Sequence, residues 1–144
     1  MWNTISSKED LDSFISVFGG FHDSCLKEMK YNSGAYVAND LSMYPYNKER
    51  LLRLIFQRQY DNPAAIEMEV SGLIIMRLSL KDADLYTCEI LGATMIMAED
   101  RIYWCDCAGV SEEDLMNYEG ILICGSQIRW RPLEERIGKG EVYK

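Results

Sequence analysis

The chain has 144 residues, of which 48% are hydrophobic and 26% are charged, and its formal net charge at pH 7 is −8. This size and composition are those of one ordinary globular domain and argue against disorder. The excess of acids argues against nucleic acid as a partner, because proteins that bind nucleic acid carry clustered Lys and Arg. No stretch approaches the ~20 consecutive apolar residues of a membrane span, and no signal-peptide pattern follows Met1. We therefore expect a cytoplasmic protein with a single domain over residues 1–137 and a flexible tail over residues 138–144.

The first element that the sequence predicts is an amphipathic helix. Ser6 and Glu9 have the spacing of a capping box, in which the hydroxyl and the acid satisfy amides at the helix start. Apolar residues follow at the i, i+3, i+4 and i+7 spacing of one helix face, namely Leu11, Phe14, Ile15 and Phe18. Gly19-Gly20 is expected to end the helix, because glycine adopts the left-handed conformation of a helix C-terminus at little cost.

From residue 24 onward the apolar period changes to two, which is typical of β-strands. Residues 25–31 and 35–38 flank Asn32-Ser33-Gly34, where the glycine can supply the positive φ of a three-residue loop. We expect these two segments to pair as a β-hairpin. Residues 39–49 are expected to form a long loop.

A shorter alternation over residues 52–57 predicts another strand, and the clearest strand pattern runs over residues 66–80. Its even-numbered residues are apolar or Gly and its odd-numbered ones are mainly polar, as in an antiparallel strand with one wet face. A straight strand of this length would span about 50 Å, so a bulge or bend is expected at Ser71-Gly72. Leu73 and Ile75, on the otherwise polar face, are expected to be covered by the N-terminal helix.

Three further elements complete the predicted domain. Residues 86–97 and 101–106 predict a strand pair, and residues 121–131 predict a last strand that Pro132 ends. Ser111, followed by three acids, predicts the start of a short helix. Together the elements predict an α+β domain, with the N-terminal helix packed on a curved, mainly antiparallel sheet of about six or seven strands.

The only histidine of the chain lies in the segment Phe21-His22-Asp23-Ser24-Cys25, where any enzyme hypothesis has to begin because histidine is the usual acid–base group at neutral pH. His22, Asp23 and Cys25 could form a thiol nucleophile with its base. However, residues an odd number apart on a strand point to opposite faces, and no oxyanion donor or orienting group is evident. The preferred interpretation is structural: Asp23 or Ser24 hydrogen-bonds the backbone, and His22 donates from a partly buried position. A hydrolase or small-ligand enzyme centred on His22 remains an alternative.

Cys105 and Cys107 lie on one face of a predicted strand and could hold zinc together with His22. A single residue between two cysteines is poor spacing for a shared tetrahedral ion, so we expect no metal and no cofactor. The cysteine count is odd and no Cys-x-x-Cys motif occurs, which predicts reduced thiols at all five positions: Cys25, Cys88, Cys105, Cys107 and Cys124.

The charge distribution over residues 99–119 is the strongest functional candidate. This segment contains seven acidic residues and a single basic one, Arg101, which gives it a net charge of −6. The acids are Glu99, Asp100, Asp106, Glu112, Glu113, Asp114 and Glu119. Such a surface would speed the encounter with a basic protein and contribute to specificity, although the same acids could simply keep the protein soluble. We expect a non-catalytic binding or inhibitory protein that docks a basic partner here. The alternative is a small structural or homodimeric module that assembles through a sheet edge or an uncovered part of the 66–80 face.

The opening of the chain carries a resemblance. Trp2, a short amphipathic helix and Phe21-His22-Asp23-Ser24 before β-strands resemble small uncharacterised bacterial proteins, some of whose look-alikes are immunity proteins of polymorphic toxin systems. The resemblance implies an α+β domain with a curved antiparallel sheet and no known enzymatic activity, and it assigns no functional residue. It agrees with the charge pattern, since an inhibitor of a nucleic-acid-cutting toxin benefits from an acidic face that mimics the phosphate backbone.

Overall fold

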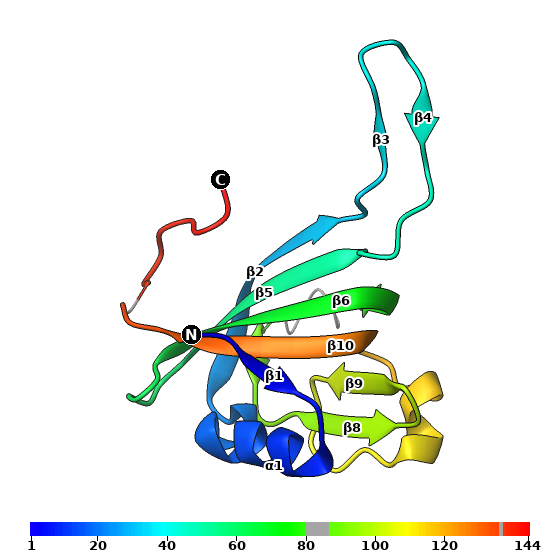
Figure 1. Ribbon diagram of the computed structural model, residues 1–144. Helices are drawn as coiled ribbons and strands as arrows, with labels where there is room; N and C mark the ends of the chain where they lie inside the picture. Colours follow the sequence, from blue (N-terminus) through cyan, green and yellow to red (C-terminus); the bar gives the residue numbers. More distant parts are fainter. Residues whose placement is uncertain (80–86, 136) are drawn as a thin grey trace.

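The computed structural model describes residues 1–79, 87–135 and 137–144. One main α-helix lies on a twisted antiparallel sheet, which confirms the predicted α+β class (Figure 1). The sheet of the described residues joins eight strands: β1 (Asn3–Ile5), β2 (Ser24–Asn32), β5 (Leu51–Arg58), β6 (Ala65–Leu78), β7 (Glu89–Ile90), β8 (Thr94–Ala98), β9 (Arg101–Cys105) and β10 (Ile121–Leu133). Their order is β7-β2-β5-β6-β10-β9-β8, and β1 pairs with β10 beside this path.

The N-cap of helix α1 (Lys8–Val17) is Ser7, one residue later than the predicted cap, Ser6. The Ser7 hydroxyl accepts from the Asp10 amide at 3.1 Å, and the Asp10 carboxylate accepts from the Ser6 amide at 2.9 Å. The predicted pairing of Ser6 with Glu9 is therefore wrong, because the same reciprocal chemistry is available one position further along the chain.

Aromatic side chains join α1 to the sheet. Phe14 and Phe18 of the helix region are fully buried, and Phe14 stacks on Trp130 of β10 with ring centroids 4.8 Å apart. The helix ends as predicted at Gly19-Gly20, which enter a 3₁₀ turn, η1 (Gly19–Phe21), with φ of 59° and 63°. The core of the domain thus lies between α1 and one face of the sheet.

The predicted hairpin of residues 25–31 with 35–38 is wrong. Strand β2 pairs with β5 and β7, whereas β3 (Tyr36–Val37) pairs with β4 (Met43–Tyr44) in a separate two-stranded sheet. In Figure 1 this ribbon projects away from the body of the molecule. Pairing with β5 places β2 beside the fully buried Leu54 and Phe56. Burial of apolar surface therefore favours pairing with this more distant strand over a local hairpin through Asn32-Ser33-Gly34.

Strand β6 bends where the sequence predicts. Gly72 has a φ of 60°, and the register against β10 shifts between Leu73 and Ile75. The bend also overturns the prediction of a single apolar face. Before it, residues 66, 68 and 70 are fully buried, but beyond it the even-numbered side chains are exposed, at 41% for Ile74, 44% for Met76 and 51% for Leu78.

A second, smaller core lies under the short 3₁₀ helix η3 (Glu112–Asn117). Leu115 of this helix is buried with Cys105 and Leu122, and Ile75 packs against them. The prediction that α1 covers Ile75 is therefore wrong, whereas Leu73 does belong to the core beneath α1.

The C-terminal half follows the predicted strands with two corrections. The segment 86–97 is divided, because β7 pairs with β2 at one edge of the sheet while β8 pairs with β9 at the other. Pro132 does not end the last strand, since β10 continues to Leu133. Neither β1 nor β9 pairs with β10 at Pro132, so β10 has an open side there. A proline is tolerated on such an open side because no ladder hydrogen bond is lost.

Candidate functional site

The turn from α1 into β2 contains His22, Asp23 and Cys25, the residues that the alternative enzyme hypothesis would use. Phe21 and Asp23 adopt positive φ values of 63° and 53°. The Ser24 hydroxyl donates to the Phe21 carbonyl at 2.6 Å, which confirms the predicted side-chain bond to the backbone. Positive φ directs Phe21 inward, where its ring centroid lies 5.0 to 5.6 Å from those of four other aromatic rings, Phe14, Phe18, Phe56 and Trp104.

His22 points outward from the same turn. Its side chain is 67% exposed, so the expectation of a partly buried histidine is wrong. The Nδ1–H donates to the Leu91 carbonyl at 2.8 Å, and Nε2 lies 3.3 Å from a carboxylate oxygen of Asp23. Cys25 is half-buried on β2, and no hydrogen bond joins it to His22. The histidine and the thiol are therefore not arranged as a nucleophile with its base.

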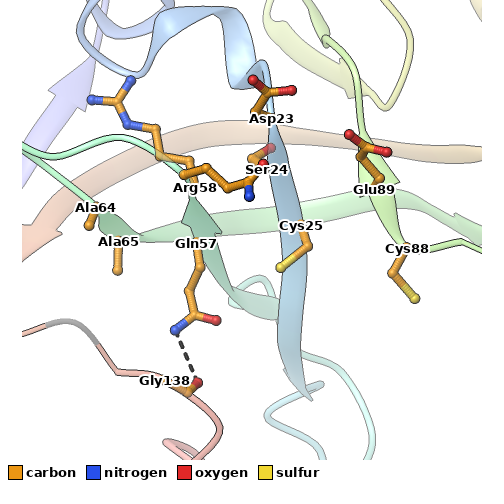
Figure 2. A pocket seen from close by; sticks show the side chains of 11 residues that line it. Asp23, Ser24, Cys25, Gln57, Arg58, Ala64, Ala65, Cys88, Glu89 and Gly138 are labelled. Atoms are coloured by element: carbon orange, nitrogen blue, oxygen red, sulfur yellow. Dashed lines mark hydrogen bonds between the residues drawn. The ribbon is translucent and has the colours of Figure 1, made fainter.

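A cavity of about 640 Å³ adjoins this turn (Figure 2). Asp23, Cys25, Arg58 and Glu89 line it together with Gln57, whose amide donates to the Gly138 carbonyl at 3.1 Å. His22 does not line the cavity. The cavity therefore combines two thiols, those of Cys25 and Cys88, with carboxylates but lacks the imidazole that the enzyme hypothesis requires.

The guanidinium of Arg58 is engaged in holding the fold. Its Nε–H donates to the Pro63 carbonyl at 2.7 Å and Nη2 donates to the Val17 carbonyl at 3.2 Å, at the end of α1. The group also stacks on the rings of Phe18 and Tyr60, at 4.7 and 5.1 Å from their centroids. Burial lowers the pKa of Arg58. A cation at a helix C-terminus is favourable because the last carbonyls carry partial negative charge.

The two cysteines weighed as zinc ligands do not share a face. Strand β9 ends at Cys105, which is fully buried, and Cys107 lies beyond it, exposed to solvent. Burial raises the pKa of the Cys105 thiol. Within residues 1–79, 87–135 and 137–144, no three metal-ligating side chains lie together.

Asp106 is not part of an exposed acidic surface, which corrects one of the seven predicted contact residues. It is half-buried, and one carboxylate oxygen accepts from the Tyr118 hydroxyl at 2.5 Å and from the Ile121 amide at 3.0 Å. Burial raises the pKa of Tyr118, and the adjacent Asp106 carboxylate raises it further. Asp106 therefore joins η3 to the start of β10.

The six other predicted acids are exposed, and they lie on two short segments, the η3 region and the turn between β8 and β9, which we call the two supports. Glu112, Glu113 and Asp114 occupy the first turn of η3, which Leu115 anchors in the small core, and Glu119 follows the helix. Glu99 and Asp100 form the turn between β8 and β9; the Asp100 side chain is 90% exposed. Figure 1 shows this turn and η3 at the same end of the sheet. We call these six residues the acidic surface: Glu99, Asp100, Glu112, Glu113, Asp114 and Glu119.

A buried charged network lies on the face of the sheet opposite the α1 core, and it was not expected from the sequence. Glu69 is 5% exposed, and its two carboxylate oxygens accept from Nε of Arg53 at 3.0 Å and Nε of Arg129 at 2.7 Å. Register explains the arrangement, because Arg53, Glu69 and Arg129 lie directly opposite one another on β5, β6 and β10. Glu69 is conspicuous in the sequence as an acid within an apolar strand, but its partners follow only from the register.

Glu67, two residues earlier, joins the chain termini to this face. It is 4% exposed, forms an ion pair with Arg131 at 2.7 Å and accepts a hydrogen bond from the Tyr143 hydroxyl. The Trp2 ring lies over the guanidinium groups of Arg129 and Arg131, 4.3 and 4.5 Å from their central carbons. Buried carboxylates on this face are thus compensated by arginines, as burial of a charge requires.

Comparison with known proteins gives no match, whether to protein-family models, to curated proteins or to solved structures. In the part of the chain that the structure describes, no helix has the length and apolar character needed to cross a membrane.

Proposed function

We propose that this protein is a non-catalytic binding or inhibitory protein that docks a basic partner through the acidic surface. The observation that carries this function is the exposure of six carboxylates on two short supports, with none of them used in an ion pair inside the core. Among the residues that the structure describes, the one cation within 4.0 Å of any of them is Arg101, whose Nε lies 4.0 Å from Asp100. These charges are therefore available to an external cation.

The supports of the acidic surface are held by packing, which favours recognition. Leu115 is 1% exposed and fixes η3 on the sheet, and the Ser111 hydroxyl donates to the Asp114 carboxylate at 2.9 Å. Arg77 of β6 donates to the Met116 carbonyl at 3.1 Å. Side chains presented on an ordered support lose less conformational entropy on binding than those of a free loop.

An immunity-like role is the more specific form of this function. A toxin that cuts nucleic acid carries a cationic substrate site, and an array of carboxylates would compete there with phosphate groups. Such an inhibitor would work in the cytoplasm, where thiols stay reduced, and no disulfide joins the five cysteines of this chain. His22 then has the structural role of clamping the turn to Leu91.

The test neutralises part of the acidic surface and compares it with an equal change elsewhere. The variant Glu112→Gln, Glu113→Gln, Asp114→Asn changes the net charge from −8 to −5, and so does the matched control Glu134→Gln, Glu135→Gln, Glu141→Gln. All six side chains are exposed, so each variant should melt within a few degrees of the wild type. Wild type and both variants serve as bait for capture from the native host, followed by quantitative mass spectrometry.

A basic protein should be captured by the wild type and by the control but recovered less with the η3 variant. Its association rate with the η3 variant should be lower, and the difference should shrink with added salt, because salt screens exposed charges. If the captured protein associates with the η3 variant at an unchanged rate at low salt, the acids serve only as a solvated face.

A further inference from the structure

The ribbon that projects from the sheet has an apolar surface with little cover. We call residues 35–47, which contain β3 and β4, the arm (Figure 1). The six large apolar or aromatic side chains of the arm are all at least half exposed: Tyr36 58%, Val37 54%, Leu41 83%, Met43 68%, Tyr44 50% and Tyr46 96%. The two strands share only two residue pairs, and a two-stranded ribbon that packs on nothing is marginally stable in water.

A second exposed apolar stretch begins at the base of the arm. The carbonyls of Glu49 and Arg50, which follow the arm, accept from the amides of Gly72 and Leu73 at 2.8 and 3.1 Å. Directly beyond lie residues 74–78 of β6, which carry the exposed Ile74, Met76 and Leu78. We call residues 74–78 the β6 end.

Among the residues that the structure describes, the β6 end is also an open sheet edge. Strand β10 pairs with it on one side, but on the other side β5 stops at the pair Leu52–Val70. No strand of the described residues occupies that side beyond Gly72. An apolar edge with unpaired backbone groups is a template for another strand, and proteins normally cover or charge such an edge.

The exposed area is large enough for a stable interface. From the exposed fractions and about 150–200 Å² for each whole side chain, the arm exposes roughly 700 Å² and the β6 end roughly 250 Å² of apolar surface. The largest apolar patch of a typical monomer is about 300–600 Å², and a standard interface buries about 800 Å² on each partner.

Charge indicates which partner covers this surface. Two copies of a chain with a net charge of −8 repel each other, so they can meet only where acids are absent. Between residues 31 and 47 the only charged residue is Asp40, and the β6 end contains only Arg77. The surface therefore offers little charge for a charged partner to recognise, while it lets two acidic copies approach. One copy also supplies both halves of the contact, a projecting ribbon and an open edge.

We propose that this protein forms a two-fold symmetric homodimer in which the arm of each protomer lies along the β6 end of its partner. The contact adds a strand to each sheet, and symmetry makes it occur twice. It uses none of the residues of the acidic surface, so it is independent of the function proposed above.

The test measures molar mass by sedimentation equilibrium from about 1 to 100 µM. The wild type should approach twice the 16.6 kDa of one chain. Two variants address the two halves of the contact: Leu41→Ser with Tyr46→Ser in the arm, and Met76→Glu in the β6 end. The matched control, Leu91→Ser, removes a 70% exposed apolar side chain that directly follows β7. Circular dichroism and melting establish that each variant is folded.

Both contact variants should weaken the dimer at least tenfold, and the control should leave it unchanged. Hydrogen exchange on the wild type provides a readout without substitutions, since the arm amides should become protected as concentration rises. A wild type that stays monomeric at about 100 µM, or a dimer that either contact variant leaves intact, would overturn the proposed interface.

Discussion

Glu69 provides the sharpest test of how the sheet is held together. Its carboxylate is 5% exposed and receives one hydrogen bond from each of two arginines, at 3.0 and 2.7 Å. Glu69→Gln keeps the shape of the side chain but removes the charge and places an amide donor against a guanidinium. The variant therefore isolates the electrostatic part of the contact.

The expected loss is about 2 kcal/mol in the free energy of unfolding. Removing one member of a fully buried ion pair costs about 3–5 kcal/mol, because the remaining charge has no partner. Here the side chains of Arg53 and Arg129 are 41% and 40% exposed, so water can hydrate them and the cost is smaller. Arg53→Gln should cost less than about 1 kcal/mol, since Glu69 keeps its bond to Arg129.

Urea unfolding followed by tryptophan fluorescence measures both losses, because Trp104 is fully buried in the native state. A loss of about 2 kcal/mol would lower the melting temperature by about 4–8 °C for a chain of this length. Glu119→Gln is the control, an exposed acid expected to change stability by less than about 0.5 kcal/mol. If Glu69→Gln costs no more than Arg53→Gln, the buried carboxylate is not what holds the three strands together.

Two further predictions concern the cysteines and the histidine. Burial raises the pKa of Cys105 and Cys124, so little reactive thiolate exists on them at neutral pH; in the native protein a thiol reagent should modify the exposed Cys107 rapidly and these two only after unfolding. Denatured, unreduced protein should show five thiols, and two or more missing groups would contradict the assignment. His22→Ala should cost less than about 1 kcal/mol in urea unfolding, because the lost hydrogen bond to Leu91 is solvent-exposed. Unchanged folding together with loss of a measured enzymatic activity would instead favour the enzyme hypothesis.

Several local features could be predicted because the residues that cause them are neighbours in the chain. The apolar stripe of α1, its end at Gly19-Gly20 and the bend at Gly72 depend on spacing and on glycine's access to positive φ. The capping box was wrong by only one residue, since serines at 6 and 7 offer the same chemistry. The exposure of six of the seven predicted acids also follows the sequence, and Asp106 is the exception.

The pair of β8 with β9, which are neighbours in the chain, was predicted. Most of the other strand pairs could not be predicted, because they depend on contacts between residues far apart in the chain. Asn32-Ser33-Gly34 favours a tight hairpin, yet β2 pairs with β5 and leaves the arm outside the sheet. The alternation over residues 66–80 gives no warning that the bend sends its last apolar residues to solvent. The edge and the arm, which carry the proposed dimer contact, both follow from this pairing.

By itself the sequence determined the composition of the domain, its helix, most of its strand segments and the acidic stretch of residues 99–119. Only the tertiary structure decided which of those acids are structural, that His22 faces solvent, and that Glu67 and Glu69 lie buried under arginines. The physical reason is that helix and turn preferences act within a few residues, whereas burial and charge pairing depend on which strands meet across the sheet.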